Sequence, residues 1–263
     1  MSKRGIYSIG SLLLVISAIA CNISNDEQKI VDIDPVFTLD MLEDLQNNKN
    51  LLFVVNSVEW QDCENFTINS AINRSPSMLE VVLNEIVPPS DCIQGFGPAT
   101  TTLTAGPLTS NRTYDIKFSL QNTVTNDGSF HNAPNYYSLA LSSTNGFGST
   151  VNELYKIPNK LIWGYIAYNE EDLVGDLPDT ILDEVKSLSN EVTLTEGYYG
   201  HFRVNDNNNL QLKRTLDFQN INTFYRLFSG NTLELKALLD DYRNGPNGDL
   251  IELKIWTDSG EVL

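Results

Sequence analysis

The sequence predicts two consecutive folded parts, an all-β sandwich over residues 37–148 and an α+β domain over residues 149–263. In the first part, short apolar runs are separated by Gly, Pro and Asn, a pattern typical of sandwich strands. In the second part, extended apolar runs alternate with segments whose apolar residues recur at helical spacing. The order of these runs is β-α-β-β-α-β.

The first part opens with a short predicted helix over residues 38–46, because Phe37, Met41, Leu42 and Leu45 fall at helical spacing. Strands are then expected at 51–60, 78–87, 100–104, 114–120 and 136–141. The last of these is expected to pair with 114–120 across a turn at 126–128. The run at 108–118 resembles the late strands of immunoglobulin-like accessory modules of bacterial surface proteins. This resemblance implies an immunoglobulin-like sandwich.

The second part begins with an apolar strand at 161–168. A helix is expected over 180–188, capped by Asp179 or Thr180. A hairpin follows, with arms at 198–204 and 210–216. The spacing of Ile221, Phe224, Tyr225 and Phe228 predicts a helical segment, and a helix over 235–242 continues it. A last strand at 250–258 completes the order of a ferredoxin-like fold.

The N-terminus has the layout of a secretory signal peptide over residues 1–20, with a basic pair, an apolar run and small residues before Cys21. The sequence Ala-Ile-Ala-Cys resembles the lipobox of bacterial lipoproteins, which implies lipidation of Cys21 and a stable membrane anchor. Residues 21–36 are expected to form an acidic tether. Their acidic pair at 26–27 resembles the surface-export signal of Bacteroidota lipoproteins. The predicted location is therefore the outer membrane, facing either the periplasm or the cell surface.

The chain is strongly acidic, with 17 basic and 34 acidic residues and a net charge of −17. Removing the signal peptide also removes two basic residues and makes the charge still more negative. Because such a charge repels phosphate backbones, we expect no nucleic-acid partner.

Cys63 and Cys92 are the only cysteines after Cys21. In an exported protein, two cysteines predict a disulfide. The competing interpretation is a metal-binding pair, which the lack of a nearby histidine disfavours.

No sequence motif of known catalytic chemistry occurs in the chain, and we assign no catalytic residue, cofactor or metal ligand. The acidic run Glu170-Glu171-Asp172 follows an aromatic strand end and suits either a sugar-cleaving site or a solvated loop. Oxygen-rich turns at 205–209 and 244–249 suit either calcium or plain turn chemistry. Asp179-Thr180-Ile181 resembles the O-glycosylation signature of Bacteroidota proteins, so Thr180 is a candidate modification site.

Alternation along the strands of the second part predicts an aromatic and basic face on its sheet. If two helices cover one face, the polar residues of the hairpin and of the last strand share the other face. This face either binds a partner or packs on the first part. Its candidate binding residues are Trp163, Tyr199, His201, Arg203, Lys213, Lys254 and Trp256.

Together these features predict a lipid-anchored cell-envelope protein that binds a protein or glycan partner without catalysis. One alternative is a carboxylate-dependent polysaccharide hydrolase. Another is a structural subunit of an outer-membrane assembly.

Overall fold

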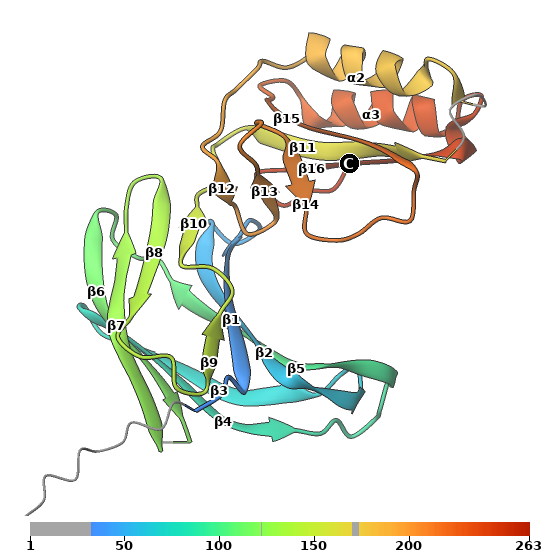
Figure 1. The fold of residues 1–263 in the computed structure, drawn as a ribbon. Coiled ribbons are helices and arrows are strands. Elements are labelled where there is room, and N and C mark those ends of the chain that lie inside the picture. Colours follow the sequence, from blue (N-terminus) through green and yellow to red (C-terminus); the bar gives the residue numbers. More distant parts are fainter. Residues whose placement is uncertain (1–32, 122, 170–173) are drawn as a thin grey trace, which may run out of the picture. The chain divides into compact units, whose positions relative to one another are not determined.

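The computed structural model describes residues 33–121, 123–169 and 174–263, which are mostly strand (Figure 1). The predicted immunoglobulin-like sandwich followed by a ferredoxin-like domain is wrong. Instead, most strands belong to one curled ten-stranded sheet, and the other strands form two three-stranded sheets. The signal peptide, Cys21 and most of the tether lie outside the described residues.

The large sheet has the strand order β10-β8-β7-β6-β4-β3-β5-β2-β1-β9. Most neighbours are antiparallel, whereas β4 with β6, β3 with β5 and β1 with β9 are parallel pairs. The strands are β1 (Phe37–Asp44), β2 (Asn50–Cys63), β3 (Thr67–Arg74), β4 (Met78–Val87), β5 (Gln94–Gly106), β6 (Arg112–Leu120), β7 (Val124–Asn132), β8 (Tyr136–Leu141), β9 (Phe147–Ser149) and β10 (Glu153–Tyr155).

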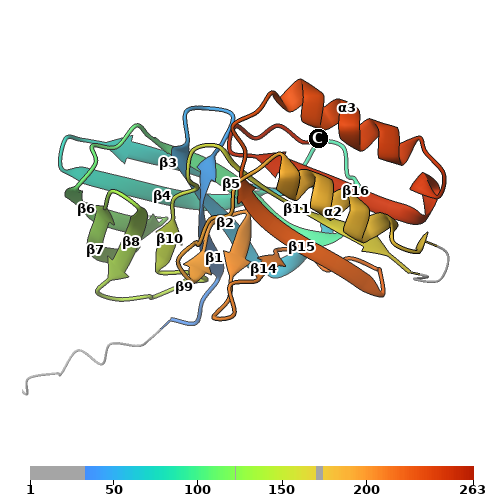
Figure 2. The same ribbon diagram turned by 90° about the horizontal axis from the view of Figure 1, so that it is seen from above.

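The large sheet is curled, and Figure 2 shows it from above. Its buried apolar residues form one hydrophobic core. The register shifts where β2 pairs with β5 and where β3 pairs with β4, and such bulges increase local bending and twist. The edge strands β9 and β10 are consecutive in the chain and are separated only by residues 150–152. Aromatic rings fill the interior, where Phe53 packs edge-to-face against Phe118 and Phe130. The predicted boundary at residue 148 falls inside β9.

The predicted leading helix at 38–46 is wrong, because this segment is strand β1. It pairs with β2 over eight residues, from Phe37 opposite Ser57 to Asp44 opposite Asn50. Every second residue of β1 is buried in the core, so its burial follows a strand period. Phe37, Leu39 and Met41 satisfy this alternation, whereas Leu42 lies on the opposite face, and pairing with β2 decides between the two structures.

The predicted pairing of 136–141 with 114–120 is also wrong, because β7 lies between β6 and β8. The expected turn at 126–128 is part of β7. Asn126 is fully buried there, and its side chain holds the 143–145 loop through bonds to Ser143 and to the backbone of Asn145. Asn126 was expected in a turn, whereas the structure buries it within β7.

The C-terminal part contains two helices and two small sheets among its described residues. One sheet has the order β15-β11-β16, and the other has the order β12-β13-β14. The elements are β11 (Leu161–Tyr168), α2 (Leu177–Ser187), β12 (Gly197–Tyr198), β13 (Phe202–Val204), β14 (Leu210–Leu212), β15 (Asn220–Leu227), α3 (Thr232–Arg243), the 3₁₀ turn η1 (Gly248–Leu250) and β16 (Ile251–Thr257).

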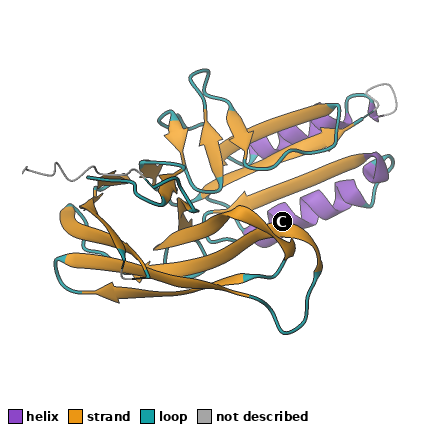
Figure 3. Ribbon diagram, turned by 60° about the horizontal axis from the view of Figure 1, so that its bottom comes forward, coloured by secondary structure: helices purple, strands orange, loops and turns teal. Residues whose placement is uncertain are grey.

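Both helices pack on one face of the β15-β11-β16 sheet (Figure 3). Ile181 of α2 and Leu235 of α3 are fully buried against Ile166 of β11 and Ile255 of β16. Helix α2 begins at Leu177, so the expected cap at Asp179 or Thr180 is wrong. Within the described residues, neither helix has the length and apolar character needed to cross a membrane.

The predicted helical segment at 221–228 is wrong, because these residues form β15. This strand pairs with β11 over eight residues, from Leu161 opposite Leu227 to Tyr168 opposite Asn220. Its sequence contains Ile, Thr, Phe and Tyr, which favour strands because they pack well on a pleated surface. Pairing with the central strand therefore outweighs the helical spacing.

The predicted hairpin exists as β13 and β14, but it belongs to a separate sheet rather than to the sheet of β11. The face of β11 opposite the helices contacts this small sheet. Trp163 of β11 packs on Phe202 of β13, with ring centroids 5.2 Å apart. The face expected to be open is therefore largely covered.

The predicted disulfide between Cys63 and Cys92 is confirmed. It joins the end of β2 to the segment before β5 and closes a loop with a sequence separation of 29 residues. In the chain-entropy model a loop of this length contributes roughly 3–4 kcal/mol.

Gly200 marks a close contact between the small sheet and β1. Its φ is +81°, and a Cβ atom there would lie 2.8 Å from Cβ of Leu42. Gly175 provides a matched control, because its φ is +54° and a Cβ there would meet nothing within 4 Å. Gly175→Ala therefore tests only the strain of a positive φ at a residue with a Cβ atom, whereas Gly200→Ala adds a steric clash with Leu42.

We expect Gly175→Ala to lower the free energy of unfolding by about 1 kcal/mol and Gly200→Ala to lower it by about 2 kcal/mol more. Urea unfolding followed by circular dichroism measures both values. Equal losses for the two variants would show that β1 does not constrain Gly200.

Candidate functional site

A pocket of about 290 Å³ lies where β1 meets the C-terminal part. We call it the tryptophan pocket. Its volume is close to the lower end of small-ligand sites, roughly 300–1,000 Å³. Its walls come from β1, β11, the β12–β13 turn, β14 and the residues after it, and β16. The lining residues are Leu42, Trp163, Gly200, His201, Leu212, Lys213, Arg214 and Trp256.

Two tryptophans give the pocket its apolar surface. Trp163 and Trp256 are directly opposite each other on neighbouring antiparallel strands, so both side chains project from the same face of the sheet. Trp163 is only 1% exposed and is fixed by contacts with Phe202 and His201. Trp256 is half-buried and packs on Tyr165 with ring centroids 5.8 Å apart. Trp256 is therefore the indole that a ligand can reach.

Charged side chains surround the two rings. Lys213 forms an ion pair with Asp40 at 2.7 Å, and Asp40 also accepts a hydrogen bond from Tyr198 at 2.8 Å. Arg214 forms an ion pair with Glu252 at 3.3 Å. These contacts hold the polar groups in fixed positions.

Tyr165 joins the second of these pairs, since its hydroxyl contacts both Glu252 and Arg214. Burial, followed by the hydrogen bond to Glu252, raises the pKa of Tyr165 to about 12, so the hydroxyl keeps its proton at neutral pH. Lys254 lies over the Trp256 ring, 5.4 Å from its centroid. Lys254 is in neither of the two ion pairs, which contain Lys213 with Asp40 and Arg214 with Glu252.

His201 contributes a neutral imidazole. Its Nε2 lies 2.9 Å from the backbone oxygen of Glu43, and because a carbonyl only accepts, Nε2 carries the hydrogen. Nδ1 is then an acceptor. Burial, partly offset by this hydrogen bond, lowers the pKa of His201 below its ordinary value of 6.5.

The structure brings together part of the candidate face from the sequence. Trp163, His201, Lys213 and Trp256 line the pocket, and Lys254 covers its Trp256 side. The two other candidates lie elsewhere.

Tyr199 is buried and stacks between Phe202 and Tyr155, next to a different cavity. Arg203 is exposed and lies over the ring of Tyr198. Thr180 is exposed in the first turn of α2, and its hydroxyl donates to the backbone oxygen of Asp176. Its glycosylation stays a prediction.

Sequence reasoning missed Leu42, Gly200, Leu212 and Arg214. Arg214 had a usable signal, since Lys213-Arg214 is the only pair of adjacent basic residues after residue 4. Leu42 was missed because its segment was expected to be helical. Its place in the pocket depends on β1 being a strand that reaches the C-terminal part.

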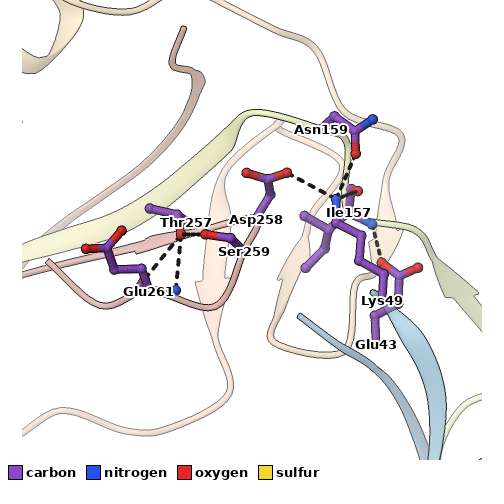
Figure 4. A network of polar contacts seen from close by, with 8 residues as sticks. All are labelled: Glu43, Lys49, Ile157, Asn159, Thr257, Asp258, Ser259 and Glu261. Carbon is purple, nitrogen blue, oxygen red and sulfur yellow. Dashed lines mark hydrogen bonds and ion pairs between the residues drawn. The ribbon is translucent and has the colours of Figure 1, made fainter. Parts of the chain in front are cut away.

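A second cavity, of about 510 Å³, lies beside Glu43 and Lys49. Figure 4 shows the polar contacts of these two residues. Lys49 Nζ donates to the backbone oxygen of Ile157 and to Asn159, and it pairs with Asp258 at 3.2 Å. Glu43 accepts a hydrogen bond from the backbone of Ile157, so this bond and the contacts of Lys49 join β1 and the residue before β2 to the C-terminal part. The tryptophan pocket, which has a half-exposed aromatic ring, is therefore the better candidate for a ligand site.

Metal binding has little support in the described part of the chain, where no group of three His, Cys, Asp or Glu side chains is placed to hold an ion. The side-chain oxygen of Asn205 accepts hydrogen bonds from the backbone of Asn207 and Asn209, which is turn chemistry. The acidic run at 170–172 lies outside the described residues.

Comparisons of the chain with protein-family models, with curated proteins and with solved structures gave no match. The function is therefore inferred from the site itself.

The lowered pKa of His201 predicts how it titrates. We expect its imidazole to stay neutral until the pH falls clearly below 6.5. Because the unfolded chain takes up this proton more readily, the free energy of unfolding falls as the pH drops below 6.5.

NMR titration of the imidazole resonances measures this pKa, and His131→Asn assigns them because the chain has two histidines. His201→Gln should reduce the pH dependence of stability in the same range. A His201 pKa at or above 6.5 would contradict the burial of this side chain.

Proposed function

We propose that this protein is a lipid-anchored cell-envelope binding protein that holds an acidic glycan in its tryptophan pocket. The observation that carries this proposal is the combination of a half-buried Trp256 with charged side chains fixed around it. Binding, rather than catalysis, is the role that these groups support.

An aromatic surface beside oriented polar groups suits a sugar. One side of a pyranose ring presents C–H groups, which pack on an indole, while its hydroxyls need both donors and acceptors. Lys213 and Arg214 supply donors, and Asp40 and Glu252 supply acceptors. Their mutual ion pairs orient these groups before a ligand arrives, which reduces the entropy lost on binding.

The charge of the site favours an acidic sugar over a neutral one. Lys213 and Arg214 line the pocket and no carboxylate does, although the whole chain carries a net charge of −17. A locally positive site on such a chain attracts a carboxylate-bearing ligand. Arg214 also has the planar geometry that matches a carboxylate.

The size of the pocket limits what can enter. A volume of about 290 Å³ suits one terminal sugar unit rather than several side chains of a protein partner. We therefore favour a glycan end as the ligand.

The proposed location rests on the sequence around Cys21. A lipid anchor followed by an acidic tether would hold the binding part next to the envelope. The pocket and the anchor are independent parts of this proposal and are tested separately.

Tryptophan fluorescence provides a direct test of ligand binding. The chain has three tryptophans, and two of them line the pocket. Trp60, which is 66% exposed on β2, is the third. In a Trp60→Phe background all indole emission therefore comes from the pocket, and we expect glucuronate-terminated oligosaccharides to change it in a saturable way.

Trp256→Ala should weaken binding of these oligosaccharides at least about tenfold, because it removes the ring that packs on the sugar. Calorimetry measures the loss in a chain that retains Trp60. The matched control is Trp60→Ala, which removes an exposed indole far along β2 and should leave the affinity unchanged. Equal affinity for Trp256→Ala and wild type would refute the proposed site.

Cys21→Ser tests the anchor. We expect this change to move the protein from the membrane pellet to the soluble fraction of cells, because Cys21 is the residue predicted to carry the acyl chains. Cys63→Ser is the control, since it removes a disulfide cysteine and should leave the protein in the pellet. Membrane retention of Cys21→Ser would contradict lipidation at this position.

A further inference from the structure

Lys156 and Asn132 make an unusually close contact away from the tryptophan pocket. Asn132 is the last residue of β7 and is 3% exposed, and Lys156 follows β10 directly. Lys156 Nζ lies 2.6 Å from Oδ1 of Asn132 and 2.6 Å from the backbone oxygen of Ala133. The amine is therefore held next to the carbonyl group of a buried amide.

The amide of Asn132 is fixed in one orientation. Its Nδ2 donates to the backbone oxygen of Leu108 at 3.1 Å and to that of Thr109 at 3.0 Å. Both amide hydrogens are used in these bonds, so the carbonyl side must face Lys156. A fixed amide next to a fixed amine resembles the near-attack geometry of an intramolecular reaction.

The surroundings act on the charge of the amine in both directions, because burial disfavours the ammonium whereas the face of the Tyr137 ring favours it. Lys156 Nζ lies 4.5 Å from the centre of the Tyr137 ring, and the ion pairs of the described residues do not include Lys156. Burial lowers the pKa of Lys156, against a smaller opposing effect of Glu43. A lysine without its proton is a nucleophile.

A buried carboxyl group lines the same space. Glu43 is 2% exposed, and burial raises its pKa despite hydrogen bonds from Ile157 and Tyr137 and the nearby lysine charges. Glu43, Asn132, Tyr137 and Lys156 all line one cavity of about 440 Å³. An acid and an amine in a poorly hydrated site can exchange a proton and both become neutral.

We propose that Lys156 and Asn132 join in an intramolecular isopeptide bond. The lone pair of Lys156 Nζ attacks Cγ of Asn132 and forms a new C–N bond. The bond from Cγ to Nδ2 then breaks, and Nδ2 leaves as ammonia with a proton that came from Nζ. The proton that Nζ loses is the proton that Nδ2 gains, so the step balances. Glu43 lines the same cavity but forms no ion pair with Lys156, so it would carry this proton across the cavity and end in its starting form. The reaction needs no oxidant and no other reactant.

The bond would tie β7 to the segment that leads into the C-terminal part. It would close a loop with a sequence separation of 24 residues. Unlike the Cys63–Cys92 disulfide, this crosslink would resist reducing agents. It is also independent of any ligand in the tryptophan pocket.

Peptide mass spectrometry of the purified full chain tests the proposal. No Lys or Arg lies between Lys117 and Lys156, and Glu153 is the only Glu in that interval. After digestion with trypsin and a Glu-specific protease, wild type should give residues 118–153 and 154–160 as one joined species. Its mass should be the sum of the two peptides less one ammonia. Acylation of Lys156 also prevents trypsin from cleaving after it.

Lys156→Arg is the matched variant, because it keeps the cation but cannot form the bond. It should give residues 118–153, 154–156 and 157–160 as separate peptides, since trypsin cleaves after an unacylated residue 156. Glu43→Gln should also give separate peptides, since Gln retains an acceptor for Ile157 but cannot relay a proton. Separate peptides from wild type would overturn the proposal. Loss of ammonia at Asn132 without joined peptides would indicate a succinimide instead and would overturn it too. A joined species from Glu43→Gln would remove Glu43 from the reaction.

Discussion

The arrangement of the described residues depends on the buried end of β1 at Glu43. Its carboxylate accepts a hydrogen bond from the backbone of Ile157 at 2.8 Å and a longer one from Tyr137, and its backbone oxygen accepts from His201. Burying a carboxyl group is costly unless such partners compensate, so these segments must meet at this point. Both the orientation of His201 in the tryptophan pocket and the cavity around Lys156 follow from this one residue.

Much of the secondary structure was predictable from local pattern. Alternation identified β6, the apolar run identified β11, and helical spacing identified α2 and α3. The errors at 38–46 and 221–228 have a shared cause. Each segment carries apolar residues at helical spacing, yet long-range pairing with β2 or β11 makes it a strand. The continuous sheet likewise depends on the parallel pairing of β4 with β6, which no local pattern in the sequence indicates.

The candidate site was partly predictable for a similar reason. Alternation along β16 correctly placed Trp256 on the side away from the helices, and adjacent first and last strands brought Trp163 opposite it. The hairpin was expected in the same sheet, yet His201 and Lys213 still reach the pocket because the small sheet covers that face. Tyr199 and Arg203 lie outside the pocket, because β13 pairs with β12 and β14 in a separate sheet rather than with β11. Leu42 enters from a strand far away in sequence, which periodicity cannot reveal.

The short strands at the two ends of the large sheet limit how another copy of the chain can pair with this sheet. An unpaired strand edge is a template on which another copy can add a strand and begin aggregation. Here the edge strands β9 and β10 are three residues each, and they are joined through residues 150–152, whose backbone bonds to Leu39 and Leu139. Little edge is left for strand addition by a neighbour. The large sheet therefore offers neighbouring copies only short edges, although it contains most of the strands of the described residues.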